Sequence, residues 1–399
     1  MLGTPKTTYI FQVLPSGHLE HLYYGVSLGD FSEKSDEELL QDAVCLEEKR
    51  AFPAGNMISY NPEHMELTLE DLRLEMSSLG KGDIREPFVE VTHADGSVTS
   101  DFLFEEAQIC DEKPEYHTLP GSQFGSRNGQ EQKDTENFCG ERFSHLLVTL
   151  KDASYDLRLE LHYYVFEDCD VIARSSRIIN DSEEAVVLNR LMSTQLDFED
   201  GGYIMSMFHG AWAREMYRSD TPVVSGKIVN SSNAGSSSNR SNPFVMLHRE
   251  ETTESSGLCY GLNLVYSGNH YEAAEVNSFG KTRFVSGINP QNFSFTLSPG
   301  EEFEAPEAVM TCSNKGFTGM SLSMHHFVRE HISRGAWKHK ARPVLLNSWE
   351  ASYFKINESR LLRLAKAGKD VGIELFVMDD GWFGERNNDD SSLGDWDVN

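Results

Sequence analysis

Short apolar and β-branched runs, separated by turn residues, dominate the chain from its start to about residue 315. Tyr9 to Leu14 is one such run, the turn at 15–17 is Pro-Ser-Gly, and the pattern resumes from His18 to Tyr24. Two apolar runs joined by a tight turn of this composition predict a β-hairpin. The beginning of the chain is therefore expected to be β structure.

Further strand-length segments fill the middle of the chain and are separated by Asp-rich turns: His145–Leu150, Tyr155–Phe166, Val171–Asn180 and Val186–Phe198. In the second of them, apolar residues alternate with polar or charged ones, namely Leu157, Leu159, Leu161 and Tyr163. This period of two is typical of strands with one buried face. The pattern predicts a large antiparallel β-sandwich, with the Gly- and Ser-rich stretches 121–141 and 230–243 as loops inside it.

The pattern changes near residue 318, where helical spacing of apolar residues over Met320–Arg334 predicts a connector helix. The short apolar strand Val344–Leu346 follows, then a helix with Asn357 as its N-cap, then the apolar run Ile373–Met378. A strand, a helix and a second, continuously apolar strand are typical of a parallel βαβ unit. We expect three parts: a β-sandwich domain at 1–318, a connector at 319–340 and the start of a (β/α)8 barrel at 341–399.

The charge and the termini limit the classes of partner. Lys and Arg number 35 against 63 Asp and Glu, a formal net charge of −28, which repels nucleic acid and anionic membranes. No window approaches 18 uninterrupted apolar residues, and the first residues lack a charged segment followed by an apolar one. We expect a cytoplasmic protein that binds a neutral polar ligand, neither nucleic acid nor a membrane.

The residues with metal-binding side chains show no local metal motif. The six cysteines form no CxxC pair, have no histidine at zinc-ligand spacing and are expected to be reduced thiols: Cys45, Cys110, Cys139, Cys169, Cys259 and Cys312. The 14 histidines contain no HExxH motif. We therefore predict neither a metal nor another cofactor.

Asp379 and Asp380 follow the second predicted barrel strand and precede Gly381 and Trp382. Because ligands bind at the carboxyl ends of parallel strands, these carboxylates are candidates for binding sugar hydroxyls. Successive strand residues point to opposite faces, so the two are poorly placed to be the carboxylate pair of a retaining glycosidase, which lie ~5 Å apart. An Asx turn or a helix cap is an equally good explanation of their positions.

Trp349 follows the first predicted barrel strand, where its ring could form one wall of a sugar pocket. Core packing is the alternative, since most tryptophans are largely buried. Trp212 and Trp337 have no comparable position and are expected to be structural.

The segments RPVLLNSWEASYF and GIELFVMDDGWFGERNNDDSSLGDW closely resemble the start of the catalytic barrel of bacterial α-galactosidases of glycoside hydrolase family 36. Earlier segments, including LELHYYVFEDCDVIARS, FHGAWARE and LSPGEEFEAPEAVM, resemble the N-terminal β-supersandwich of that family. The resemblance implies retaining hydrolysis of terminal α-linked galactose from oligosaccharides such as raffinose or melibiose. It also implies that Asp379 and Asp380 hold galactose hydroxyls and that Trp349 forms a pocket wall.

The same resemblance implies that catalysis needs residues beyond this chain. The family's nucleophile lies in a Lys-x-Asp motif of a later barrel strand, and its acid/base aspartate comes later still. A complete barrel takes about 250 residues, so 341–399 is expected to hold only the first two βα units. We assign no catalytic residue, and none to Asp389, Asp390, Asp395 or Asp397. The chain is expected to be an N-terminal fragment, inactive alone.

The resemblance further implies a homo-oligomer in the full-length form, because family members associate through the N-terminal region. One alternative function stays open, a non-catalytic carbohydrate-binding or assembly β-sandwich module. Sugar binding that survives deletion of 341–399 would distinguish such a module from the first part of an enzyme.

Overall fold

The computed structural model describes residues 1–29, 34–35, 38–39, 41, 58–65, 67–110, 112–124, 143–237 and 239–399. They form two compact units, Met1–Ile332 and Ser333–Asn399. Cys45, Cys139 and the predicted loop residues 125–141 lie outside the described residues. Among the described residues, no helix has both the length and the apolar character needed to cross a bilayer.

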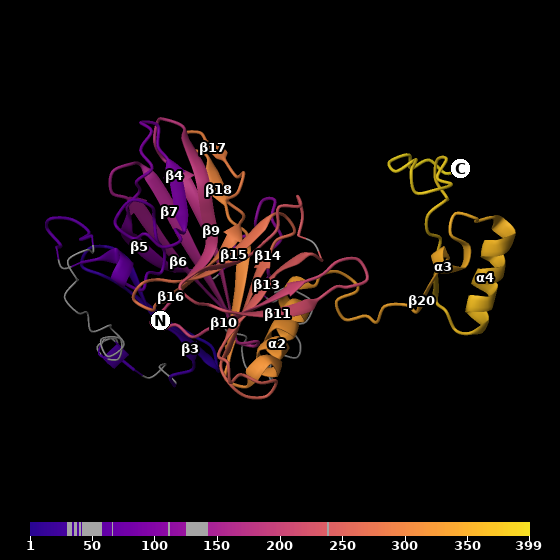
Figure 1. Ribbon diagram of the computed structural model, residues 1–399, viewed down its shortest axis with the longest axis horizontal. Helices are drawn as coiled ribbons and strands as arrows, with labels where there is room; N and C mark the ends of the chain where they lie inside the picture. The colour runs from indigo at the N-terminus through magenta and orange to yellow at the C-terminus, as the bar shows by residue number, and fades with distance from the viewer. Residues whose placement is uncertain are drawn as a thin grey trace, which may run out of the picture. The chain divides into compact units, whose positions relative to one another are not determined.

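Three antiparallel sheets make up the first unit (Figure 1). The smallest has the order β1 (Leu2–Gly3), β2 (Thr7–Val13), β3 (Leu19–Val26). The largest has the order β11 (Tyr217–Pro222), β10 (Ile204–His209), β13 (Ser241–His248), β14 (Cys259–Val265), β19 (Glu307–Ser313), β8 (Val171–Asn180), β7 (Leu157–Phe166), β6 (Phe143–Asp152), β5 (Phe102–Cys110), with β18 (Glu302–Glu304) also paired to β8. The third has the order β12 (Gly226–Ser231), β15 (His270–Val276), β16 (Thr282–Ile288), β9 (Val186–Phe198), β17 (Phe295–Leu297), with β4 (Val89–Thr92) also paired to β9.

The mostly β fold and its sandwich are confirmed. The hairpin of β2 and β3 encloses the predicted turn, and β6 to β9 correspond to the four predicted strands, although β7 begins two residues later than predicted. The alternating residues predicted to face inward on β7 are all buried, at 0–1 % exposure: Leu157, Leu159, Leu161 and Tyr163. Leu161 shares one buried cluster with Leu196 of β9 and Phe284 of β16, so the core lies between the two larger sheets.

The large sheet is covered on its other face by helix α2 (Gly316–Phe327), which continues into a π turn at Val328–Ile332. Met320, Met324 and Phe327 of the helix pack with Phe166 of β7 and Val309 of β19 in a second buried cluster. Both faces of β7 and β8 are therefore largely buried, unlike those of a strand with one face in water. The predicted connector helix therefore begins four residues earlier than expected and packs on the sandwich.

The predicted loop at 230–243 is wrong at both ends, because Asn230 belongs to β12 and Ser241 to β13. Asn230 is 1 % exposed; its amide nitrogen donates to Asn242 O and to Glu272 Oε2, both at 2.8 Å, and its Oδ1 accepts from the Ser241 hydroxyl at 2.7 Å. These bonds join β12 to its neighbour β15 and to β13 of the large sheet, and they satisfy the buried polar groups of Asn230. A composition rich in Ser and Asn cannot reveal them.

The second unit contains β20 (Leu345–Asn347), α3 (Trp349–Ser352), α4 (Glu358–Asp370) and β21 (Leu375–Val377). The two strands pair in parallel, with Leu345 opposite Leu375. Helix α4 begins after Asn357, whose side chain accepts a hydrogen bond from Arg360 N at 3.0 Å, as the predicted N-cap requires. After β21 the chain continues in turns to Asn399, so the second strand is followed by no helix among these residues.

Candidate functional site

The predicted site residues gather where β20 and β21 end. Asn347 is the last residue of β20 and pairs with Val377, the last residue of β21. Because the strands are parallel, their carboxyl ends share one edge, and the residues that follow them meet there. Ser348 N donates to Val377 O at 3.0 Å, which extends the pairing by one step.

Asp379 is held by groups from both strand ends. Its Oδ2 accepts from Asn347 Nδ2 at 2.6 Å, and its backbone N–H donates to Ser348 Oγ at 3.1 Å. Its Oδ1 accepts from the backbone N–H of Asp380 at 2.8 Å. Each carboxylate oxygen has two acceptor sites, so one protein donor on each leaves both able to accept a hydroxyl.

Asp380 has a different partner, Arg386, whose Nη2 lies 3.3 Å from Asp380 Oδ2. The Arg386 side chain is 5 % exposed, and its Nη1 donates to Ser391 O at 2.8 Å. This arginine fixes the loop that follows β21 and places a positive charge beside the carboxylate. The two aspartates thus differ in their surroundings: Asp379 is bonded to groups at the strand ends, and Asp380 is paired with a buried arginine.

Trp349 begins α3, and its backbone N–H donates to Asn347 Oδ1 at 2.8 Å. Asn347 therefore contacts residues that follow each of the two strands. Its Oδ1 accepts from the backbone N–H of Trp349, and its Nδ2 donates to Asp379. The Trp349 ring packs edge-on against Tyr353 and Phe354, with ring centroids 5.2 and 5.0 Å apart. These contacts restrict the ring to one orientation while the residue stays half-buried.

Gly381 turns the chain directly after the aspartate pair. Its φ of +94° is one that residues with a side chain rarely adopt, and an added Cβ would come within 3.4 Å of Phe354 O. Glycine at this position is therefore needed to turn the backbone after Asp380.

Asp379, Asp380 and Trp349 are the predicted site residues, whereas the contacts that Asn347, Ser348 and Arg386 make with the two aspartates were not predicted from the sequence. The position of Asn347 at the end of β20 is a usable signal, because a polar residue there faces the residues after β21. Arg386 lies in a polar loop with no periodicity, so its contact with Asp380 has no signature in the sequence.

Chemically, this edge offers two carboxylates, a carboxamide and an indole. Carboxylates accept hydrogen bonds from hydroxyl groups, and an aromatic ring packs against apolar faces. Such a set suits a polyhydroxylated neutral ligand.

The comparisons place this arrangement among glycosyl hydrolases. The chain belongs to glycosyl hydrolase family 36: residues 17–298 match the "Glycosyl hydrolase family 36 N-terminal domain" and residues 302–399 match "Melibiase". The resemblance stated from the sequence motifs is thereby confirmed.

Curated relatives include the alpha-galactosidase AgaA of Geobacillus stearothermophilus, 36 % identical over 401 residues, with 100 % of this chain and 51 % of the relative covered. The bifunctional alpha-galactosidase/sucrose kinase AgaSK of Mediterraneibacter gnavus is 37 % identical over 398 residues, covering 100 % of this chain and 40 % of the relative. The chain thus spans about half the length of the first relative and 40 % of the second.

Solved structures of α-galactosidases also match the whole chain over about half of their own length. The alpha-galactosidase of Lactobacillus brevis superposes with a TM-score of 0.88 at 36 % identity, covering 100 % of this chain and 50 % of that one. A variant of AgaA solved in complex with raffinose also has a TM-score of 0.88 at 36 % identity, covering 100 % of this chain and 52 % of that one.

Proposed function

We propose that this chain is the N-terminal part of a retaining α-galactosidase that hydrolyses terminal α-linked galactose from oligosaccharides such as raffinose or melibiose. The observation that carries the proposal is the match of the whole chain to half of an α-galactosidase structure that holds raffinose. The carboxylates at the strand ends are the type of group that such a ligand needs.

In this proposal, Asp379 and Asp380 accept hydrogen bonds from the galactose hydroxyls, and Trp349 packs against the sugar ring. Asn347 and Arg386 are positioning residues, because they contact the aspartates at 2.6 and 3.3 Å. The nucleophile and the acid/base belong to later barrel strands. Retention requires those two groups, which form and then hydrolyse a covalent galactosyl-enzyme.

A chimera tests this proposal: residues 1–399 followed by the remaining half of AgaA. We expect it to hydrolyse melibiose, and Asp379→Asn to lower kcat/KM at least about 100-fold, since hydrogen bonds to a charged group contribute ~1.5–3 kcal/mol each and Asp379 can accept several. Asp390→Asn is the matched control, because that exposed aspartate lies in the following loop. A soluble chimera without hydrolytic activity, or equal effects of both substitutions, would argue against the proposal.

The 399-residue chain alone is expected to release no galactose, because binding groups without a nucleophile or proton donor leave little catalysis. Galactose release above the protein-free blank would contradict this expectation. The assay uses raffinose and melibiose with the chimera as the positive control.

We also propose that the full-length protein is a homo-oligomer in the cytoplasm. The turn between β10 and β11 exposes Trp212 at 89 % and Met216 at 58 %, and Tyr217 at the start of β11 is 61 % exposed. Exposed apolar groups of this size mark interaction surfaces. The described cysteines are free thiols, which fits a reducing compartment. Light scattering of the wild-type chimera and of Trp212→Ala tests the assembly.

A further inference from the structure

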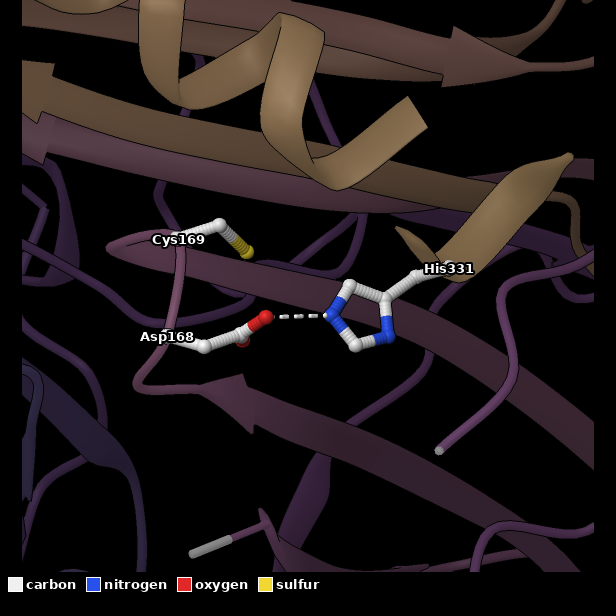
Figure 2. A group of neighbouring side chains, drawn as sticks. All are labelled: Asp168, Cys169 and His331. Atoms are coloured by element: carbon white, nitrogen blue, oxygen red, sulfur yellow. Dashed lines mark hydrogen bonds and ion pairs between the residues drawn. The ribbon is translucent and has the colours of Figure 1, made fainter. Parts of the chain in front are cut away.

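Three side chains from distant parts of the first unit converge near the end of α2. Asp168 and Cys169 lie in the turn between β7 and β8, and His331 lies in the π turn after α2 (Figure 2). Their carboxylate oxygen, Sγ and ring nitrogen all lie within 4.8 Å of one another. Cys169 is 2 % and His331 4 % exposed, so the group is formed by buried side chains with one carboxylate nearer the surface.

The orientation of His331 is fixed by its second nitrogen. Its Nδ1 lies 2.9 Å from Gln123 O, and because a carbonyl oxygen only accepts, Nδ1 carries a proton. Its Nε2 lies 2.9 Å from Asp168 Oδ2, on the side of Cys169 (Figure 2). Metal-binding histidines have this arrangement, in which one nitrogen donates to a backbone carbonyl and the other faces the ion.

A fourth ligand is within reach. His326, on α2, has its Nε2 4.0 Å from the same Asp168 Oδ2, and its side chain is 43 % exposed. The α-helix changes to a π turn between His326 and His331, and both rings approach one carboxylate oxygen. Asp168, Cys169 and His326 also line a cavity of about 310 Å³, which gives a hydrated ion a route to the cluster.

We propose that Asp168, Cys169, His326 and His331 bind a divalent cation of the zinc class. One oxygen, one sulfur and two nitrogens are donors that four-coordinate zinc accepts, whereas magnesium and calcium prefer oxygen alone. The metal–sulfur bond replaces the S–H bond of Cys169, and the bond to His331 Nε2 replaces the N–H that faces Asp168, so two protons pass to solvent. His326 binds through a ring-nitrogen lone pair and releases none.

Within the triad of Asp168, Cys169 and His331, the required adjustments are small. Tetrahedral zinc with ordinary bond lengths separates an oxygen and a nitrogen ligand by about 3.3 Å, and a sulfur from either by about 3.6 Å. The Asp168–His331 pair, now 2.9 Å apart, must open by a few tenths of an ångström. The remaining pairs of the triad start within 4.8 Å and must close by at most about 1 Å.

A second group of described residues, His117 with Glu302 and Glu304, also has its ligand atoms within 4.8 Å of one another, but none of the three side chains is buried. The His117 side chain is 79 % exposed, so the group resembles an ordinary exposed set of polar side chains. In the proposed site, by contrast, the cation would join the β7–β8 turn to the last turn before Ser333, where the second unit begins.

Cobalt substitution tests the site in the 399-residue chain. After treatment with a chelator, titration with Co²⁺ is expected to give one equivalent of tetrahedral cobalt with a sulfur-to-cobalt charge-transfer band, and Zn²⁺ should abolish both signals. Cys169→Ser should remove the charge-transfer band. Cys259→Ser is the matched control, since Cys259 is equally buried but lies outside the cluster.

A folded wild-type chain that gives only octahedral cobalt, or a charge-transfer band that persists in Cys169→Ser, overturns the proposal. The surface substitution His326→Ala is expected to weaken Co²⁺ binding at least about tenfold without affecting the fold, because it removes one ligand. An unchanged affinity would remove His326 from the ligand set. Zn²⁺ should raise the Tm of the wild-type chain but not that of Asp168→Asn, and an equal rise in both would count against the site.

Discussion

Glu75 is a fully buried carboxylate, and its partners decide its effect on stability. Arg174 Nη1 lies 2.8 Å from its Oε1, the hydroxyl of Tyr163 also donates to Oε1 at 2.8 Å, and His21 Nδ1 lies 2.9 Å from its Oε2. Burial by itself raises the pKa of Glu75, but the charge of Arg174 and the hydrogen bonds of His21 and Tyr9 outweigh it and lower the pKa to about 2. The carboxylate is charged throughout the neutral range.

Because the folded pKa lies below the ordinary value of 4.5, this group stabilises the fold above pH 4.5, and the contribution is lost as the pH falls toward 2. Glu75→Gln should lower the free energy of unfolding by about 3–5 kcal/mol at pH 7, since it leaves Arg174 buried without its charged partner. The variant should also lose less stability than the wild type between pH 4.5 and 2.

Urea denaturation at several pH values measures both effects. Asp181→Asn is the control, because the Arg158–Asp181 pair is exposed and surface pairs contribute at most about 1 kcal/mol. If the two variants lose the same free energy of unfolding, the buried Glu75 network contributes no more to stability than an exposed ion pair.

Single elements show what the sequence could predict. The strand β7 and its inward face were predictable because Leu157, Leu159 and Leu161 alternate with polar residues, and all three are buried. The strands of the second unit differ from their apolar runs: β20 is shifted by one residue from the predicted Val344–Leu346, and β21 keeps only three of the six predicted residues, Leu375–Val377. Hydrogen-bond partners on a neighbouring strand set such limits, and the run itself does not contain them.

The candidate site was predictable only for residues that come just after a predicted strand in the sequence. Asp379, Asp380 and Trp349 directly follow the two short strands, so the parallel arrangement brings them to one edge. The proposed cation site gave no such signal, because Cys169 and His331 are distant in the sequence and meet only when α2 packs on β7. A search for ligands at fixed spacing therefore predicted no metal.

Helix α4 offers a test of local stability in the second unit. Asn357 Oδ1 accepts from Arg360 N and from the Ser359 hydroxyl, and within the helix only Gly368 is buried, so the cap carries a large share of its stability. Asn357→Ala should cost about 1 kcal/mol and speed hydrogen exchange of the α4 amides about fivefold. Lys366→Ala, on the exposed surface of the helix, should leave the exchange unchanged or slower. Equal exchange in all three chains would show that the cap does not limit opening.

At the scale of the whole molecule, the buried apolar side chains are divided unequally between the two units. Among the described residues, Phe383 is the only hydrophobic side chain of the buried core beyond Ile332. Val344, Leu345 and Leu375 of the second unit are 56, 50 and 42 % exposed, although their apolar character suits buried strands. The first unit therefore contains nearly all of the described hydrophobic core.

This division predicts that residues 1–332 fold alone. The fragment should unfold cooperatively with a Tm within a few degrees of that of the 399-residue chain, because its core clusters end at Ile332. Limited proteolysis of the full chain should first cut near 333–343, where most residues are exposed, and leave the same fragment as a resistant product. Deletion of 316–399 is the matched control: it removes Met320, Met324 and Phe327 from the outer face of the large sheet and should lower the Tm markedly. If both deletions destabilise the fold equally, the second unit contributes to the stability of the first, and the boundary at Ser333 does not separate independent folding units.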